Sequence, residues 1–297
     1  MGFQAEFVVA VLVSGIVAGA IYALLGLAVV LIFRTTGVAN FAQGEMATFS
    51  VFLFLMYATQ IKLPIALQWL LTIAVASVIS GTIYLALLRP NAEGAERLNL
   101  TVRTLGLYTL IHGLALYWWG EGEPYTVPGL FPGSSVALGS FNVAYDQIGT
   151  LVVAGIVGFA LLLLFRFTQL GLAMRAVAIS PESATLLGVN VRLISLVVWV
   201  LAGAIGAVAG LLVAPVSFLE TALMQPYILK AFTAAILGGF QSFPGAIVGG
   251  LILGVAESVA GAWISIHLRE PFTFAILLLV LLLRPGGLFG RAEAGRV

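Results

Sequence analysis

The feature that most constrains this chain is a series of long apolar segments separated by short polar connections. An α-helix needs about 20 apolar residues to cross the roughly 30 Å of hydrocarbon in a bilayer. Segments 44–59 and 227–240 are shorter than this and have polar flanks. We therefore expect an all-α, polytopic membrane protein with about nine transmembrane helices, two of them short. The expected spans are 7–33, 44–59, 65–88, 104–119, 147–167, 193–214, 227–240, 246–266 and 272–284.

The composition agrees with a membrane protein and excludes several kinds of site. Of the 297 residues, 61% are hydrophobic and 8% are charged, whereas a soluble domain carries about 25% charged residues. We expect one membrane domain over residues 1–297. The chain has no cysteine and only two histidines, which argues against disulfides and against thiolate or histidine-rich metal sites. We predict no catalytic residue, no metal and no cofactor, hence no enzyme, and a net charge of +1 offers no basic patch for nucleic acid.

The positions of the cations predict how the chain is oriented. Ten of the thirteen lysines and arginines lie at Arg34, in 89–103, in 166–192 and in the tail after 283. The connection 120–146 carries acidic residues and no cation. Because cytoplasmic loops are rich in lysine and arginine, we expect 120–146 and the N-terminus outside and the C-terminus in the cytoplasm. For all of these cation-rich connections to lie inside, both short segments must cross the membrane.

A weak internal repeat relates the two short segments. Residues 19–29 align with 203–213 at an offset of 184, with seven of eleven positions identical. The same offset places 44–59 on 228–243, and the paired helices run in opposite directions. Transporters use inverted repeats with short, interrupted helices to build a pathway at the membrane midplane. We therefore predict a possible inverted repeat. We interpret the pairs Gly15/Gly19 and Gly250/Gly254 as close helix packing.

Two polar segments could line such a pathway, because polar groups facing lipid are costly. The candidate pathway residues are Asn40, Gln43, Glu45, Gln241 and Ser242. The alternatives are a hairpin turn with Glu45 in the first turn of a helix and a tight turn at Pro244-Gly245. Glu257 lies in the middle of a span and is either a buried carboxyl bonded to a neighbouring helix or a pathway residue.

A third segment, 168–192, is expected to lie in the cytoplasm. Ser180 followed by Pro181 is typical of a helix start, and Gly188 of a helix stop. We predict a two-turn helix over 181–187 that exposes Glu182, Ala184 and Leu187. The flanking arginines and small residues favour a docking surface over a short loop helix at the membrane interface.

This helix resembles a motif of ABC importer permeases. Glu182-Ser-Ala184-x-x-x-Gly188 has the spacing of their E-A-A-x-x-x-G pattern, with Ser183 in place of the middle alanine. The segment through Asn190 resembles the branched-chain amino acid (Liv-type) permeases. Three further blocks do so too: 19–24 with Ala39-Asn-Phe-Ala-Gln-Gly-Glu45, Arg103-Thr-Leu-Gly-Leu107, and 230–239 with 243–250. The family usually has a histidine at the position of Gln43.

The resemblance implies one half of a transmembrane pathway in a bacterial or archaeal cytoplasmic membrane. The implied partners are a second, related permease, two cytoplasmic ATPases and an extracytoplasmic solute-binding protein. The expected solute is an amino acid of the branched-chain type or a related small polar solute. The chain has no Gly-x-x-x-x-Gly-Lys-[Ser/Thr] run, so ATP would be bound by partner subunits. The residues expected to couple to the ATPases are Arg175, Glu182, Ala184, Leu187, Gly188 and Asn190.

The main alternative is an ion-coupled secondary transporter. It requires ionisable residues within the membrane, for which Glu45, Glu257 and Lys230 are the candidates. A channel or a structural membrane protein is a third hypothesis. Neither alternative explains a capped cytoplasmic helix, and only the ABC importer requires copurifying ATPase subunits.

Overall fold

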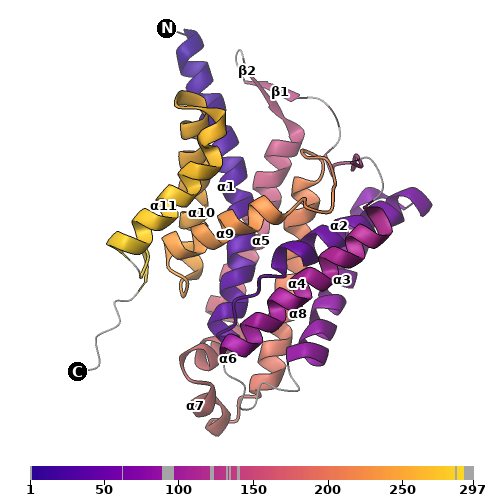
Figure 1. Ribbon diagram of the computed structural model, residues 1–297, viewed down its shortest axis with the longest axis vertical. Helices are drawn as coiled ribbons and strands as arrows, with labels where there is room; N and C mark the ends of the chain where they lie inside the picture. The colour runs from indigo at the N-terminus through magenta and orange to yellow at the C-terminus, as the bar shows by residue number, and fades with distance from the viewer. Residues whose placement is uncertain are drawn as a thin grey trace.

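The computed structural model describes residues 2–61, 63–88, 97–120, 124–131, 133, 135–138, 141–284 and 286–290. Nearly all elements are helices, and a two-stranded antiparallel hairpin is the exception (Figure 1). The α-helices are α1 (Gly2–Thr36), α2 (Gln43–Gln60), α3 (Ile65–Ile83), α4 (Arg97–Trp119), α5 (Tyr145–Phe167), α6 (Gln169–Ile179), α7 (Pro181–Leu186), α8 (Val191–Val213), α9 (Gln225–Gly238), α10 (Phe243–Trp263) and α11 (Arg269–Leu283). The hairpin consists of β1 (Ser135–Leu138) and β2 (Phe141–Ala144), and the remaining elements are the π-helical turn η1 (Tyr84–Leu88) and the 3-10 turn η3 (Ile266–Leu268).

The helices confirm an all-α, polytopic membrane protein. Each of the nine expected spans falls on a helix. Among the described residues, six helices are long and apolar enough to cross a membrane. The expected spans 44–59, 104–119 and 227–240 fall on α2, α4 and α9, which are shorter or more polar. That these three also cross stays a prediction.

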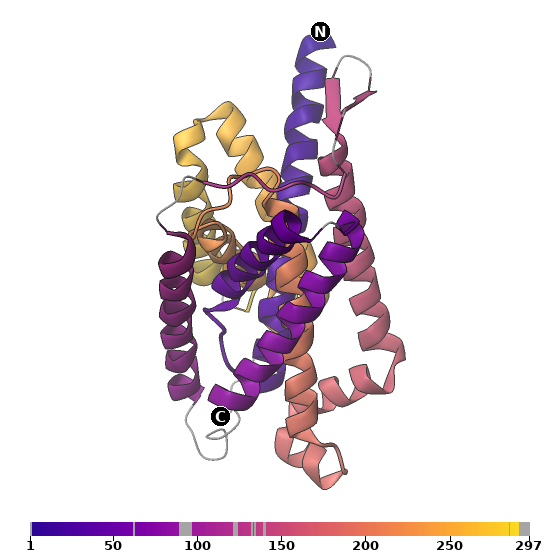
Figure 2. The same cartoon turned by 90° about the vertical axis from the view of Figure 1, so that its right-hand side faces the viewer.

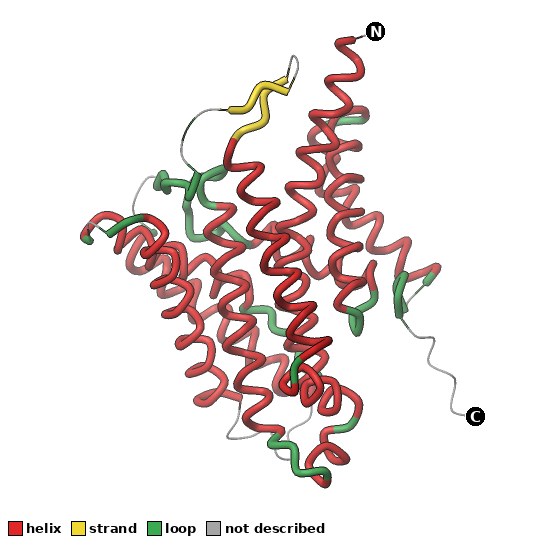
Figure 3. The backbone as a smooth tube through the Cα atoms, turned by 180° about the vertical axis from the view of Figure 1, so that it is seen from behind, coloured by secondary structure: helices red, strands yellow, loops and turns green. Residues whose placement is uncertain are grey.

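The two ends of the molecule carry different elements. The start of α1 and the β1–β2 hairpin lie at one end, and α6 and α7 lie at the opposite end (Figures 1 and 3). The connections expected on opposite sides of the membrane are thus at opposite ends of the molecule. Residues 89–96, 121–123 and 291–297, on which part of the orientation argument depends, lie outside the described residues.

The packing of the helices supports the inverted repeat. α1 packs along α10, and its counterpart α8 packs along α3; likewise α1 contacts α9 as α8 contacts α2. Individual positions correspond at the offset of 184. The rings of Tyr22 and Tyr227 are 6.2 Å apart, and the equivalent positions, Gly206 and Gln43, also meet, since a Cβ at Gly206 would lie 2.5 Å from Nε2 of Gln43.

Glycines allow the central helices to approach closely. A Cβ built on Gly19 would lie 2.8 Å from the carbonyl oxygen of Gly250, and one built on Gly15 would lie 2.8 Å from Cα of Val255. In lipid, where burial of apolar surface does not drive helices together, small residues at such crossings permit dense packing. The interpretation of these glycine pairs as packing residues is confirmed.

The helices of the two expected short spans, α2 and α9, lie obliquely across the middle of the molecule (Figure 1). α4 and α11 flank them on one side, which is the left-hand side in Figure 2. α4 contacts mainly α2, and α11 contacts mainly α9 and α10. Both flanking helices therefore leave most of their apolar surface exposed. Between α4 and α11, the surface is formed by α9 and the start of α2. We call this side the α9 face.

Candidate functional site

The local structure of α7 agrees with the signals in its sequence. The hydroxyl oxygen of Ser180 accepts a hydrogen bond from the backbone N–H of Ser183 at 3.2 Å, and Pro181 occupies the first turn. Gly188 follows with a φ of +83°, which disfavours any residue that carries a Cβ. The predicted start and stop of this helix are confirmed, although its last helical residue is Leu186 and not Leu187.

Exposed apolar side chains lie at both ends of α7. Leu186 and Leu187 are 89% and 81% exposed, and Ile179 before the helix is also exposed. We call these three residues the apolar patch of α7. Glu182 lies in the first turn and is exposed too. Exposed apolar patches in a polar setting mark interaction sites, so this end of the chain has the character of a docking surface.

The prediction that Ala184 is exposed is wrong. Its side chain is 2% exposed, because α7 packs against α6 and α8 and Ala184 lies on the side of the helix turned towards them. Its carbonyl oxygen also accepts a hydrogen bond from the backbone N–H of Val189 at 3.0 Å. The small side chain thus allows α7 to sit closely on the membrane helices.

The other two residues expected to take part in coupling lie beside α7. Asn190 caps α8, and its Oδ1 accepts a hydrogen bond from the N–H of Leu193 at 3.0 Å. Arg175 lies on α6, close to Arg34 and Phe243. The guanidinium of Arg34 stacks 4.9 Å from the centre of the Phe243 ring. Arg175 therefore lies where α6 meets the ends of α1 and α10.

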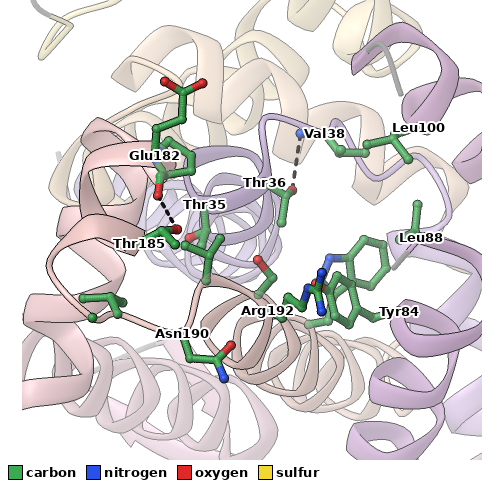
Figure 4. A pocket seen from close by; sticks show the side chains of 16 residues that line it. Thr35, Thr36, Val38, Tyr84, Leu88, Leu100, Glu182, Thr185, Asn190 and Arg192 are labelled. Carbon is green, nitrogen blue, oxygen red and sulfur yellow. Dashed lines mark hydrogen bonds between the residues drawn. The ribbon is translucent and has the colours of Figure 1, made fainter. Parts of the chain in front are cut away.

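A cavity of about 1000 Å³ separates part of α7 from the membrane helices. Glu182 and Thr185 of α7 lie on one side of it, and Thr35 and Thr36 of α1 on another (Figure 4). Tyr84 of η1 closes a third side. The helix α7 is thus joined to the rest of the chain through α6 and α8, while the cavity leaves a gap between α7 and α1.

Asn40 and Gln43 are completely buried in this chain. The Nδ2 of Asn40 donates to Oε1 of Gln43 at 3.1 Å, and its Oδ1 accepts from the N–H of Ala42. The Nε2 of Gln43 donates to the carbonyl oxygen of Ala202 at 2.8 Å, which joins the start of α2 to α8. Their hydrogen bonds hold the connection between α1 and α2, from which Phe41 projects with 37% exposure.

Aromatic rings continue from Phe41 along α9. The ring of Phe41 stacks on that of Phe232 with centres 5.1 Å apart, and Phe232 stacks on Phe240 at 6.1 Å. Gln225, Leu229, Phe232 and Ile236 recur every three or four residues and are all at least partly exposed. They form one stripe of the helix, which is the surface that α9 presents between α4 and α11.

Glu45 lies in a polar cluster at the beginning of α9. Its side chain is 1% exposed, and Oε2 is 3.2 Å from Nδ1 of His112 on α4. Its Oε1 accepts from Nε2 of Gln225 at 3.4 Å, and the same nitrogen donates to the hydroxyl oxygen of Tyr108 at 2.9 Å. We call Glu45, Tyr108, His112 and Gln225 the Glu45 cluster.

Gln241 and Ser242 lie at the other end of α9. Ser242 caps α10, with its hydroxyl oxygen accepting from the N–H of Gly245 at 3.1 Å, and Gln241 is exposed in the turn. The 14 residues of α9 correspond to about 20 Å of helix. The structure therefore brings Asn40, Gln43 and Glu45 together and places Gln241 and Ser242 about one helix length away.

Glu257 is a buried carboxylate bonded to neighbouring helices. Its Oε1 is 2.6 Å from Nζ of Lys230 on α9, and its Oε2 accepts from the hydroxyl of Tyr22 on α1 at 2.8 Å. The ammonium nitrogen of Lys230 also lies 5.5 Å from the centre of the Tyr22 ring. Of the two alternatives for Glu257, the structure therefore shows a buried carboxyl bonded to neighbouring helices.

Several of these residues were missed by the sequence analysis. Tyr22 and Gln225 gave no signal, because their partners are at least 117 residues away in the chain. Thr104, Tyr108 and His112 could have been found from the sequence, since a spacing of four residues places them on one stripe of an otherwise apolar helix. Among the described residues, no group of three or more histidines or acidic residues could hold a metal ion.

Comparisons with known proteins show the family of this chain. The family described as the permease component of the branched-chain amino acid transport system matches residues 11–283. The permease protein LivH of the high-affinity branched-chain amino acid transport system of Salmonella typhimurium is 32% identical, over 96% of both chains. Its counterpart BraD from Pseudomonas aeruginosa is 31% identical, over 96% of this chain and 97% of BraD.

More distant relatives act on other solutes. The galactose/methyl galactoside import permease protein MglC of Escherichia coli is 31% identical, over 66% of this chain and 57% of MglC. No solved structure matches the chain. Since the relatives are permease components of transport systems, the findings support an ABC importer permease and not an enzyme or an ion-coupled transporter. The chain belongs to the family of branched-chain amino acid transport system permease components.

Proposed function

We propose that this permease forms one half of the translocation pathway of an importer for amino acids of the branched-chain type. The closely similar relatives are named for branched-chain amino acids, and they align over nearly the whole chain. The proposed partners are a second, related permease, two cytoplasmic ATPases that bind ATP, and an extracytoplasmic solute-binding protein. No cofactor belongs to this chain in the proposal.

The proposed orientation places α6 and α7 in the cytoplasm and the β1–β2 hairpin outside. The N-terminus is then outside and the C-terminus inside. Arg166, Arg175 and Arg192 gather around α6 and α7, whereas β1 and β2 carry no charged residue. An excess of arginine in the connections on one side favours the cytoplasmic side for it.

We place the pathway along the α9 face. Glu45 acts on the pathway through the partly exposed Tyr108, His112 and Gln225 of its cluster. Gln241 and Ser242 lie at the cytoplasmic end of α9. Asn40 and Gln43 are buried, so in this proposal they act by holding Phe41 on the pathway side. A second permease would supply the opposite wall, since α4 and α11 leave this side of a single chain open.

The observation that carries the proposal is the apolar patch of α7. It lies at the end of a short helix whose start is capped by Ser180 and whose stop is set by Gly188. Exposed leucines in a rigid setting outside the membrane fit a closely packed protein partner. The cytoplasmic ATPase is the partner that an importer needs at this end.

The experiment is copurification of the ATPases with variants of α7. We expect the double variant Leu186→Asp, Leu187→Asp to lose bound ATPase and solute uptake, because two carboxylates would enter an apolar contact. Thr185→Ser is the control, since it changes an exposed residue of the same helix, keeps the hydroxyl that donates to the carbonyl oxygen of Pro181, and leaves the two leucines unchanged. Full ATPase binding and uptake in the double variant would refute the proposed coupling role of α7.

A further inference from the structure

We infer that the Glu45 cluster is a binding site for the ammonium group of the transported solute, with Nε2 of His112 as the atom that receives it. This inference deepens the proposed function and rests on the placement of the pathway along the α9 face. Of this cluster, only Glu45 is among the candidate pathway residues of the sequence analysis.

The carboxylate and the imidazole form a dyad with a defined direction. Oε2 of Glu45 lies 3.2 Å from Nδ1 of His112. A carboxylate accepts hydrogen bonds only, so in a neutral ring the proton resides on Nδ1 and Nε2 carries a lone pair. Among the described residues, Nε2 has no hydrogen-bond partner. The dyad thus presents an acceptor that is polarised by the carboxylate behind it.

Exposure decides which member of the dyad a solute can reach. Glu45 is 1% exposed, whereas the side chain of His112 is 24% exposed. Tyr108 is one helical turn before His112 on α4, and the two rings are parallel within 2° with centres 6.0 Å apart. The hydroxyl of Tyr108 accepts from Gln225, which holds this pair of rings against the start of α9.

The charge of the cluster calls for a cation. Within the described part of the chain, Glu45 forms no ion pair with lysine or arginine. Glu257 differs, since its carboxylate is already matched by the ammonium of Lys230. The ion-pair partner of Glu45 is His112, which is charged only when it is protonated. With a neutral His112 the carboxylate is unmatched, which is costly within the membrane, and a cationic group bound at His112 would reduce this cost.

The chemistry of the reachable atom favours an ammonium over a metal ion. Hard cations such as Mg²⁺ and Ca²⁺ prefer oxygen ligands, and here the carboxylate oxygens are covered. A nitrogen lone pair accepts an N–H, which an ammonium donates. Leu229 lies one turn after Gln225 on α9 and is half exposed, so it offers an apolar contact for an aliphatic side chain. These features fit an aliphatic amino acid.

The experiment follows the imidazole nitrogens of His112 by NMR in the intact importer complex in nanodiscs, with ¹⁵N-labelled histidine. The signals of His112 are assigned by their absence in a His112→Asn variant, which also separates them from partner histidines. His267, exposed in η3, is the internal control. The probes are leucine, 3-methylbutylammonium, which lacks the carboxylate, and 4-methylpentanoate, which lacks the ammonium.

We expect leucine and 3-methylbutylammonium to shift the His112 signals and to leave His267 unchanged, and 4-methylpentanoate to shift neither. In a Glu45→Gln variant that retains its melting temperature, affinity for 3-methylbutylammonium should fall about tenfold or more, the loss expected for one charge-assisted hydrogen bond. Equal shifts with 4-methylpentanoate, or no shift with either ammonium, would overturn the inference, and the titration itself is made on the unmodified chain.

Parallel assays separate failure of the inference from failure of the proposed function. Leucine uptake and ATPase copurification are measured on the same preparation. If both are normal and His112 does not respond, the ammonium site is wrong while the permease function stands. If the complex binds no ATPase and takes up no leucine, the proposed function itself is contradicted.

Discussion

Lys230 and Glu257 lie on adjacent helices, α9 and α10, with Nζ of the lysine 2.6 Å from Oε1 of the glutamate. Tyr22 of α1 donates to the other carboxylate oxygen at 2.8 Å. One carboxylate thus joins three helices, including the short α9, which has few residues of its own to hold it in place. Removing one partner of a buried pair leaves an uncompensated charge, which costs about 3–5 kcal/mol.

We therefore predict that Lys230→Met lowers the free energy of unfolding by about 3–5 kcal/mol. The double variant Lys230→Met, Glu257→Met should lose less, because it leaves no unpaired charge. The measurement is the apparent melting temperature in detergent. Glu270→Gln, which removes an exposed carboxylate on α11, is the control and should melt like the unmodified protein. A double variant less stable than Lys230→Met would contradict this account.

Gln43 and Gln241, the two glutamines expected near the pathway, should respond differently to substitution. Gln43→Leu leaves the carbonyl of Ala202 and the amide of Asn40 without their buried partner, which costs about 1–3 kcal/mol. Gln241→Leu changes an exposed turn and should leave the free energy of unfolding unchanged. Both are measured by thermal unfolding and by uptake per folded molecule.

Uptake then separates a structural from a pathway role. If Gln43 acts only by holding the connection before α2, total uptake by Gln43→Leu should fall in proportion to the loss of folded protein, and uptake per folded molecule should stay unchanged. If Gln241 lies at the cytoplasmic end of the pathway, uptake by Gln241→Leu should change at full stability. Normal uptake by a fully stable Gln43→Leu protein would show that neither role applies to Gln43.

Gly188 provides a test of the helix end that depends on backbone conformation alone. Its φ is +83°, and no atom lies within 4 Å of a Cβ built at this position. A side chain would therefore meet no obstacle, and the cost is that of the left-handed conformation, about 1–2 kcal/mol. We predict that Gly188→Val weakens ATPase copurification, whereas Gly188→Asn largely preserves it, because asparagine tolerates this region. Equal behaviour of the two variants would show that the φ angle does not matter.

How much could be predicted from the sequence depended on the range of the interactions. Ser180, Pro181 and Gly188 act within a few residues, so the start and stop of α7 could be predicted from local rules. The long helices could be predicted from the apolar segments because this signal, too, is local in the sequence. Whether Ala184 faces water or protein depends on α6 and α8, and a helix of two turns carries too short a pattern to show it.

The polar clusters depend on contacts between distant parts of the chain. Glu45 and Glu257 could be singled out because carboxylates are rare in apolar segments, but their partners could not be named. His112 is 67 residues from Glu45 and Lys230 is 27 residues from Glu257. The inverted repeat was visible in the sequence only as seven identities, and the paired contacts of α1 with α10 and α8 with α3 gave it structural support.

The last prediction concerns the orientation of the chain in the membrane. Ser183 on α7 and Val216 after α8 are both exposed, and α8, which is long enough to cross a bilayer, lies between them. Because the chain has no cysteine of its own, Ser183→Cys and Val216→Cys each introduce a single thiol. We predict that an impermeant maleimide labels Val216→Cys on intact cells and Ser183→Cys only after the cells are opened.

Each variant serves as the matched control of the other, since both thiols are exposed and only their side of the membrane differs. Labelling after lysis establishes that both are reactive. The arginines around α6 and α7 are the reason for expecting this result, because they favour the cytoplasmic side. If Ser183→Cys were labelled on intact cells and Val216→Cys were protected, α7 would lie outside the cell, where no ATPase could reach its exposed leucines. The coupling proposal would then fail together with the orientation.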